Sequence, residues 1–240
     1  MRRIEILILV LGLAMSVVTE KAAAQEERAQ GRSVVASRYG IVAAESPLAA
    51  QAGATILARG GHAVDAAVAA NAVMGLVSPG MNGIGGDLFA IVYEARTGKV
   101  YGLNASGWAP AGLSIQYLQE KGLPRIPPSG IHSVTVPGTV DGWDKLLSRF
   151  GRLKFSDVLA PAIRHAEEGF PVTEWISGDW EASEGVLRNN ATAARTFLLN
   201  GRAPRFGDVF KNPDLAWSLK QIAANGRKAF YEEEIARRIL

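Results

Sequence analysis

Residues 78–110 form a glycine-rich turn that leaves one helix and enters a β-hairpin, and this order of helix, turn and hairpin constrains the fold more than any other feature. The segment reads SPGMNGIGGDLFAIVYEARTGKVYGLNASGWAP. Two strand-like runs, residues 88–94 and 99–103, flank the turn pair Thr97-Gly98, so we predict a hairpin. The hairpin ends in small and polar residues, where a backbone and a ligand can approach each other closely.

The residues before the turn predict two helices. Ser46 offers an N-cap acceptor and Pro47 suits the first helical position, while Gly60-Gly61 ends the helix. The second helix starts near His62 and runs through AVDAAVAANAVMGLV, which is apolar on nearly every side and is therefore expected to be buried. Residues 39–44 are apolar and β-branched, and predict a short strand.

The residues after the hairpin predict a mostly helical remainder. A short strand is expected at 133–136. Helical patterns cover 111–123, 139–150, 155–169, parts of 175–202, 213–225 and 229–240. Pro161 is expected to kink its helix or to mark the true start. Because no internal repeat or linker interrupts these elements, the sequence indicates one domain in which helices and strands are mixed.

The N-terminus has the three parts of an export signal. Arg2 and Arg3 are followed by an apolar run over residues 6–18 and by the small residues Ala22-Ala23-Ala24. The run is shorter than the roughly 20 apolar residues of a membrane span, so we expect no stable span, although an uncleaved anchor is the alternative. The predicted organisation is a signal peptide at 1–24, a flexible leader at 25–37 and a domain at 38–240, in a periplasmic or secreted protein.

Composition excludes several classes of function. The chain has no cysteine, which excludes disulfides, cysteine nucleophiles and thiolate metal sites. The net charge is +3 without a basic stripe, so no nucleic-acid partner is expected. His62, His132 and His165 lack the spacing of metal ligands, and we expect no metal site. His62 lies three residues before Asp65 and is interpreted as a helix cap.

The glycines at 80, 83, 85 and 86 do not form a nucleotide site. Phosphate-binding loops leave a strand and open a helix, whereas here a helix comes first and a strand follows. They are interpreted as a tight turn, or as a turn that also lines a substrate pocket. No G-x-S-x-G nucleophile elbow is present, and no cofactor is expected.

The end of the hairpin carries the candidate substrate-binding residues. They are Asn104, Ser106, Gly107 and Trp108. Trp108 follows Ser-Gly at a hairpin end, where its ring can wall a pocket, and ordinary packing is the alternative. The residues by themselves provide no complete catalytic apparatus.

Residues 40–240 resemble the N-terminal part of γ-glutamyltranspeptidase-family precursors. The segments that carry the resemblance are GIVAAESPLAAQAGATILARGGHAVDAAVAANAVMGLVSP, GIGGDLFAIVY, VPGTVDGW, DVLAPAIRHAEEGFPV and FYEEEIARRI. Their order and spacing together make the resemblance specific. It implies an α+β fold, namely part of the four-layer αββα sandwich of N-terminal nucleophile hydrolases, in the helix-rich portion of the large chain.

The resemblance also implies a mechanism. The precursor cuts itself, and the new N-terminal threonine of the small chain attacks a γ-glutamyl amide with its own α-amino group as base. Water or an amine then takes the acyl group. In this interpretation the nucleophile lies beyond Leu240, so no catalytic residue belongs to this chain, which alone is expected to be inactive. The expected partners are a small-molecule amide and the small chain of the same precursor.

One departure concerns the substrate. The family typically has a phenylalanine-arginine-glutamate run before Ala-Pro, and its arginine holds the substrate α-carboxylate. Alignment on Ala109-Pro110 places Ser106 at the arginine and Gly107 at the glutamate, and serine lacks the bidentate guanidinium contact. The sequence therefore predicts an exported γ-glutamyltransferase-like enzyme acting on glutathione-type amides. One alternative is an amidohydrolase or acylase that takes another acyl group, with Trp108 forming a wall of its site. The other is a non-catalytic decayed fragment.

Overall fold

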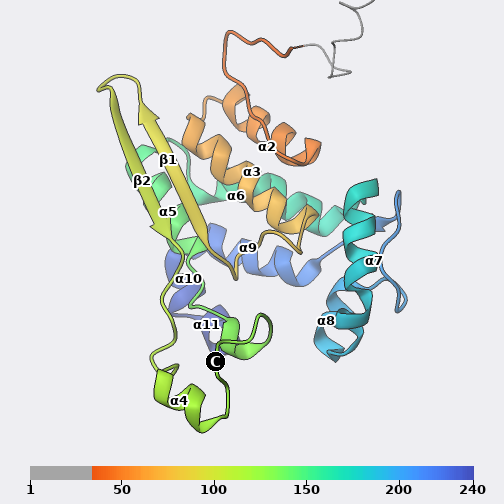
Figure 1. The fold of residues 1–240 in the computed structure, drawn as a ribbon. Coiled ribbons are helices and arrows are strands. Elements are labelled where there is room, and N and C mark those ends of the chain that lie inside the picture. The colour runs from red at the N-terminus through yellow and green to blue at the C-terminus, as the bar shows by residue number, and fades with distance from the viewer. Residues whose placement is uncertain (1–33) are drawn as a thin grey trace, which may run out of the picture. The chain divides into compact units, whose positions relative to one another are not determined.

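The computed structural model describes residues 34–240, so the predicted signal peptide and most of the predicted leader lie outside the described residues. Residues Tyr39–Leu240 form one unit (Figure 1). Its elements are α2 (Pro47–Ala58), α3 (Ala63–Val77), β1 (Leu88–Glu94), β2 (Lys99–Ala105), α4 (Ile115–Glu120), the 3-10 turn η1 (Ile131–Ser133), α5 (Thr139–Phe150), α6 (Phe155–Glu168), β3 (Phe170–Pro171), α7 (Glu174–Arg188), α8 (Ala191–Phe197), β4 (Val209–Phe210), α9 (Pro213–Asn225), α10 (Arg227–Tyr231) and α11 (Glu234–Ile239).

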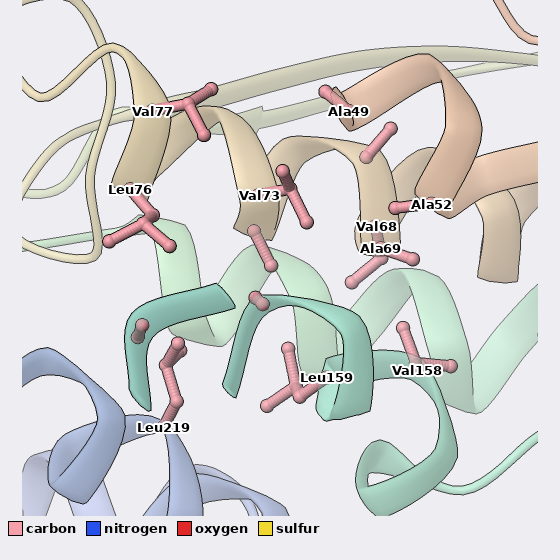
Figure 2. Close-up of a cluster of buried hydrophobic side chains, with 14 of the residues drawn as sticks. Ala49, Ala52, Val68, Ala69, Val73, Leu76, Val77, Val158, Leu159 and Leu219 are labelled. Atoms are coloured by element: carbon pink, nitrogen blue, oxygen red, sulfur yellow. The ribbon is translucent and has the colours of Figure 1, made fainter. Parts of the chain in front are cut away.

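A stack of four helices holds the core. Helix α2 packs on α3, α3 on α6, and α6 on α9 (Figure 1). The predicted burial of α3 on most sides is confirmed, because ten of its fifteen residues are buried. Figure 2 shows side chains of the stack converging in one cluster. Among them Val73 of α3 and Leu159 of α6 are fully buried. Alanine-rich faces allow such close helix packing.

The ends of these helices largely follow the predicted capping residues. Pro47 is the first residue of α2, but the Ser46 side chain makes no capping hydrogen bond. At α3 the His62 N–H donates to Asp65 Oδ2 at 2.6 Å, while His62 Nδ1 is buried and has no hydrogen-bond partner among residues 34–240. Fully buried Asp65 also accepts from the N–H groups of Arg152 and Leu153. Asp65 therefore ties the start of α3 to the connection between α5 and α6.

The predicted hairpin is present and runs antiparallel from Leu88↔Ala105 to Glu94↔Lys99. Its second strand continues two residues beyond the predicted end. The inner face lies on α5, where a Cβ atom at Gly142 would lie 2.5 Å from Leu88 Cδ2. The absence of a side chain at 142 therefore lets the hairpin approach the helix. The outer face exposes Phe89, Ile91 and Tyr93.

Two predicted strands are wrong. Residues 39–44 form no strand, and they pair with no other strand within the described part of the chain. Residues 133–136 form no strand either. The 3-10 turn η1 ends at Ser133, and after it a single hydrogen bond, from the Val136 N–H to the Trp108 carbonyl, joins this segment to the corner of the hairpin. An apolar β-branched run becomes a strand only when a partner strand satisfies its backbone groups.

Three helix predictions need correction. The helix expected at 111–123 is limited to α4, which begins where the Ser114 hydroxyl accepts from the Tyr117 N–H at 3.0 Å. The helix expected at 229–240 is divided into α10 and α11. Helix α6 continues through Pro161, so Pro161 does not mark its start, and the alternative of a kink at Pro161 stays a prediction.

A second small sheet pairs β3 with β4 through Phe170↔Phe210. Residues 34–240 therefore contain two two-stranded sheets among many helices, and the predicted α+β class is confirmed. Within this range, none of the helices combines the length and the apolar character that crossing a membrane requires.

Candidate functional site

The candidate site is built around the end of the hairpin, residues 104–108, which we call the corner. Asn104 Oδ1 accepts a hydrogen bond from the Ser106 N–H at 2.9 Å, so the asparagine turns the chain with its own side chain. Gly107 follows with a φ of 75°, in the left-handed region that favours glycine. Asn104, Ser106, Gly107 and Trp108 are therefore brought together by one local turn.

A second segment, residues 135–139, crosses the corner at backbone distance, and we call it the clamp loop. A Cβ atom at Gly107 would lie 1.8 Å from the Val136 oxygen, and one at Gly138 would lie 2.0 Å from the Ala105 oxygen. The Val136 N–H donates to the Trp108 carbonyl at 2.9 Å. No side chain fits at either glycine, so the two backbones fix each other's position.

The clamp loop also holds the glycine turn that precedes the hairpin. The Gly86 carbonyl accepts from the N–H groups of Gly138 and Thr139 at 2.9 and 3.1 Å. The Thr139 hydroxyl donates to the same carbonyl at 2.9 Å, and Thr139 is fully buried. The predicted tight turn is confirmed, because the Met81 N–H donates to the Ser78 carbonyl and the Gly86 N–H donates to the Gly83 carbonyl. The clamp loop thus holds both ends of the hairpin, although it lies far from the hairpin in the sequence.

Tyr231 of helix α10 also binds the clamp loop. The Tyr231 hydroxyl donates to the Pro137 carbonyl at 2.8 Å and accepts from the Asp141 N–H at 3.0 Å. Burial raises the pKa of Tyr231, so the hydroxyl remains a donor at neutral pH. Burial alone would raise the pKa of Asp141, but hydrogen bonds from Lys145 and Arg227 outweigh it and hold that pKa below its ordinary value. Asp141 is therefore a carboxylate paired with two cations.

Two hollows lie near these elements, and neither is lined by the four predicted binding residues. A polar hollow of about 640 Å³ is bordered by the glycine turn, with Asn71, Asn82 and Asp87 in its wall. An apolar groove of about 530 Å³ lies between residues 78–81 and helices α7 and α8. The glycine turn thus lines a hollow, and the interpretation that it lines a substrate pocket stays a prediction. The Trp108 side chain is 85% exposed, and its role as a pocket wall stays a prediction.

Sequence reasoning missed the groups that hold the corner. Thr139 was expected only to cap the helix that it begins, and no local pattern related Thr135 or Tyr231 to the corner. Thr135 Oγ1 lies 3.4 Å from the Ser106 oxygen, and Tyr231 is 94 positions from Pro137. The one available signal was the glycine before Thr139, because a glycine beside a helix start often marks a close backbone approach.

The gamma-glutamyltranspeptidase family profile matches residues 49–240. The chain belongs to this family. It is 41% identical over 210 residues to the glutathione hydrolase-like YwrD proenzyme of Bacillus subtilis, covering 87% of this chain and 39% of that relative. The chain thus spans about two fifths of that relative's length.

Solved structures agree with the family. The gamma-glutamyltranspeptidase of Helicobacter pylori superposes with a TM-score of 0.81 at 29% identity, covering 86% of this chain and 60% of that one. The cephalosporin acylase of Bacillus halodurans gives a TM-score of 0.77 at 38% identity, covering 88% and 41%. This family is an enzyme family, and the chain carries part of its N-terminal nucleophile hydrolase fold.

Proposed function

We propose that the chain is the N-terminal portion of an exported enzyme that hydrolyses or transfers γ-glutamyl groups of glutathione-type amides. The nucleophile would be the N-terminal threonine of a small chain formed by self-cleavage of a precursor, outside these 240 residues. The observation that carries the proposal is the corner held by the clamp loop. It supports the proposal because the family resemblance assigns the substrate contact to this short polar segment, and two backbone crossings hold the segment in place.

The corner would border the acyl group of the substrate. The threonine hydroxyl would attack the amide carbonyl, and the threonine α-amino group would take the hydroxyl proton and pass it to the leaving nitrogen. The C–N bond would then break, releasing the amine as the acyl-enzyme ester forms. Water or an acceptor amine would then release the acyl group. A corner fixed by two glycine crossings suits this task, because binding groups must keep their positions while charge develops on the substrate.

A second candidate, an amidohydrolase or acylase with another acyl group, is favoured by Ser106. A serine hydroxyl provides one neutral hydrogen bond in place of a paired guanidinium, so an α-carboxylate gains little there. One solved neighbour is a cephalosporin acylase, so the structures similar to this chain include an enzyme named for another substrate. The two candidates share the nucleophile and differ in the group that the corner accepts.

The test uses the complete gene product. A denaturing gel is expected to resolve two chains, and N-terminal sequencing of the smaller one is expected to begin with threonine. A single uncut chain would instead support the decayed, non-catalytic fragment. N-terminal sequencing of the larger chain tests export, because cleavage after Ala24 leaves Gln25 first. Residues 1–240 expressed alone are expected to hydrolyse no amide.

Substitution at the corner separates the two acyl-group candidates. Kinetics are measured on γ-glutamyl anilide and on anilides of acyl groups without an α-carboxylate. If the acyl group is not γ-glutamyl, Ser106→Arg is expected to lower KM for γ-glutamyl anilide about tenfold or more. Ser133→Arg, placed on the exposed η1, is the matched control and is expected to leave KM unchanged. Robust glutathione hydrolysis by the unaltered enzyme would favour the first candidate.

A further inference from the structure

We infer that Tyr231 is a positioning residue that sets the spacing between the clamp loop and the corner, and thereby the fit of the acyl group. This inference rests on the proposed function. Tyr231 belongs to α10, and its hydroxyl reaches the middle of the clamp loop at the Pro137 carbonyl. It would touch no substrate and would act only through the backbone that it holds.

Pro137 lies between the two glycine crossings in the sequence, so its position affects both. On one side of it the Val136 oxygen faces Gly107, and on the other side Gly138 faces the Ala105 oxygen. A movement of the Pro137 carbonyl would shift both crossings together. Because neither crossing has room to compress, such a movement would be passed on to Ser106 and Trp108.

The other hydrogen bonds of the clamp loop join it to the corner, to the glycine turn and to α5, where the Gly138 carbonyl accepts from the Gly142 N–H at 2.9 Å. Val136 binds the corner, while Gly138 and Thr139 bind the glycine turn. Among residues 34–240, the Tyr231 hydroxyl provides the side-chain hydrogen bond that anchors the clamp loop to an element other than the corner, the glycine turn and α5. It also accepts from the Asp141 N–H in the first turn of α5, so it fixes the loop relative to the helix that supports the hairpin.

The ring of Tyr231 is held independently of its hydroxyl. Arg227 lies over the ring at 4.9 Å from its centroid and binds Asp141 through Nε at 2.6 Å. Removal of the hydroxyl therefore leaves the ring in place. It leaves the Pro137 carbonyl without this donor and the Asp141 N–H without this acceptor, which loosens the loop without opening a cavity.

The closing experiment compares Tyr231→Phe with Tyr101→Phe in the complete gene product. Tyr101 packs on Phe150, and no hydrogen bond of its hydroxyl occurs among residues 34–240. The Tyr231 variant is expected to mature into two chains, to keep kcat within about twofold, and to raise KM about tenfold. The ratio of kcat/KM between γ-glutamyl anilide and a second acyl anilide should change at least about threefold. The control should change neither value.

A merely structural role would give a different result. If Tyr231→Phe lowers the melting temperature and leaves KM and the substrate ratio as in the unaltered enzyme, the positioning role is overturned. Amide hydrogen exchange supplies a readout without substrate. The N–H groups of Val136, Gly138 and Thr139 should exchange about tenfold faster in the variant, while that of Arg152, bound to Asp65, should not change.

The exchange measurement also separates this inference from the proposed function. An unaltered protein that remains one uncut chain contradicts the proposed function, whatever Tyr231 does. Unchanged exchange at Val136 and Gly138 in Tyr231→Phe contradicts the positioning role, even in a fully active enzyme. The two failures are therefore distinct.

Discussion

The helical stack and the hairpin are held in place by different means. In α2, α3, α6 and α9 the apolar side chains are buried against one another, and residues such as Leu159 are fully covered. The hairpin is covered on one face only, and Phe89, Ile91 and Tyr93 on its other face are 65%, 83% and 65% exposed. Its position is set by backbone crossings at two glycines. Side-chain volume therefore governs the stack, whereas backbone approach governs the candidate site.

The largest effect is expected from Gly107→Ala, which tests the backbone crossing. The new Cβ would lie 1.8 Å from the Val136 oxygen at a φ of 75°, so both a clash and backbone strain result. Together they should lower the free energy of unfolding by about 4 kcal/mol, measured by denaturant titration. Gly112→Ala is the control, because a Cβ there meets nothing within 4 Å, and it should change stability by less than about 0.5 kcal/mol. An equal loss of stability in Gly107→Ala and Gly112→Ala would contradict the close backbone crossing at Gly107.

Leu159→Ala tests the stack in the same way and should be slightly milder. Leu159 is one of the cluster residues labelled in Figure 2 and has no exposed surface. Loss of its side chain should cost about 3 kcal/mol, from lost burial and from the cavity that remains. Ile115→Ala on α4 removes an apolar side chain that is 78% exposed, and should cost less than about 0.5 kcal/mol. A similar loss from both variants would mean that burial does not distinguish them.

The same contrast explains how much was predictable. Helix α3 has a local pattern, a run that follows a capping residue and is apolar on nearly every side, so its position and burial followed from the sequence. The corner was predicted as a group of neighbours, and Asn104 turns it through a local bond. What holds the corner was not predictable, because no periodicity relates Gly107 to Val136 or Pro137 to Tyr231. The failed strand at residues 39–44 has the same cause, since pairing depends on distant residues.

A pair of helix caps sharpens the comparison within the stack. Asn212 Oδ1 accepts from the Leu215 N–H at 2.9 Å at the start of α9, whereas Ser46 makes no side-chain bond at the start of α2. Asn212→Ala should therefore cost about 1 kcal/mol of unfolding free energy, while Ser46→Ala should cost less than about 0.5 kcal/mol. Thermal or chemical unfolding measures both. A larger loss of unfolding free energy in Ser46→Ala than in Asn212→Ala would show that the type of capping residue matters here more than the observed hydrogen bond.

The smallest effect on stability is expected at the outer face of the hairpin. Ile91 lies opposite Gly102 and is 83% exposed, so it contributes little packing within the chain. Ile91→Thr keeps a β-branched side chain and should change the free energy of unfolding by less than about 0.5 kcal/mol. It should also reduce self-association, measured by sedimentation, because exposed apolar strand faces recruit other copies. A loss above about 1.5 kcal/mol would mean that this face is packed in solution, because burial of an isoleucine is worth at least that much. The hairpin would then resemble the stack, and the backbone crossings would no longer be its main support.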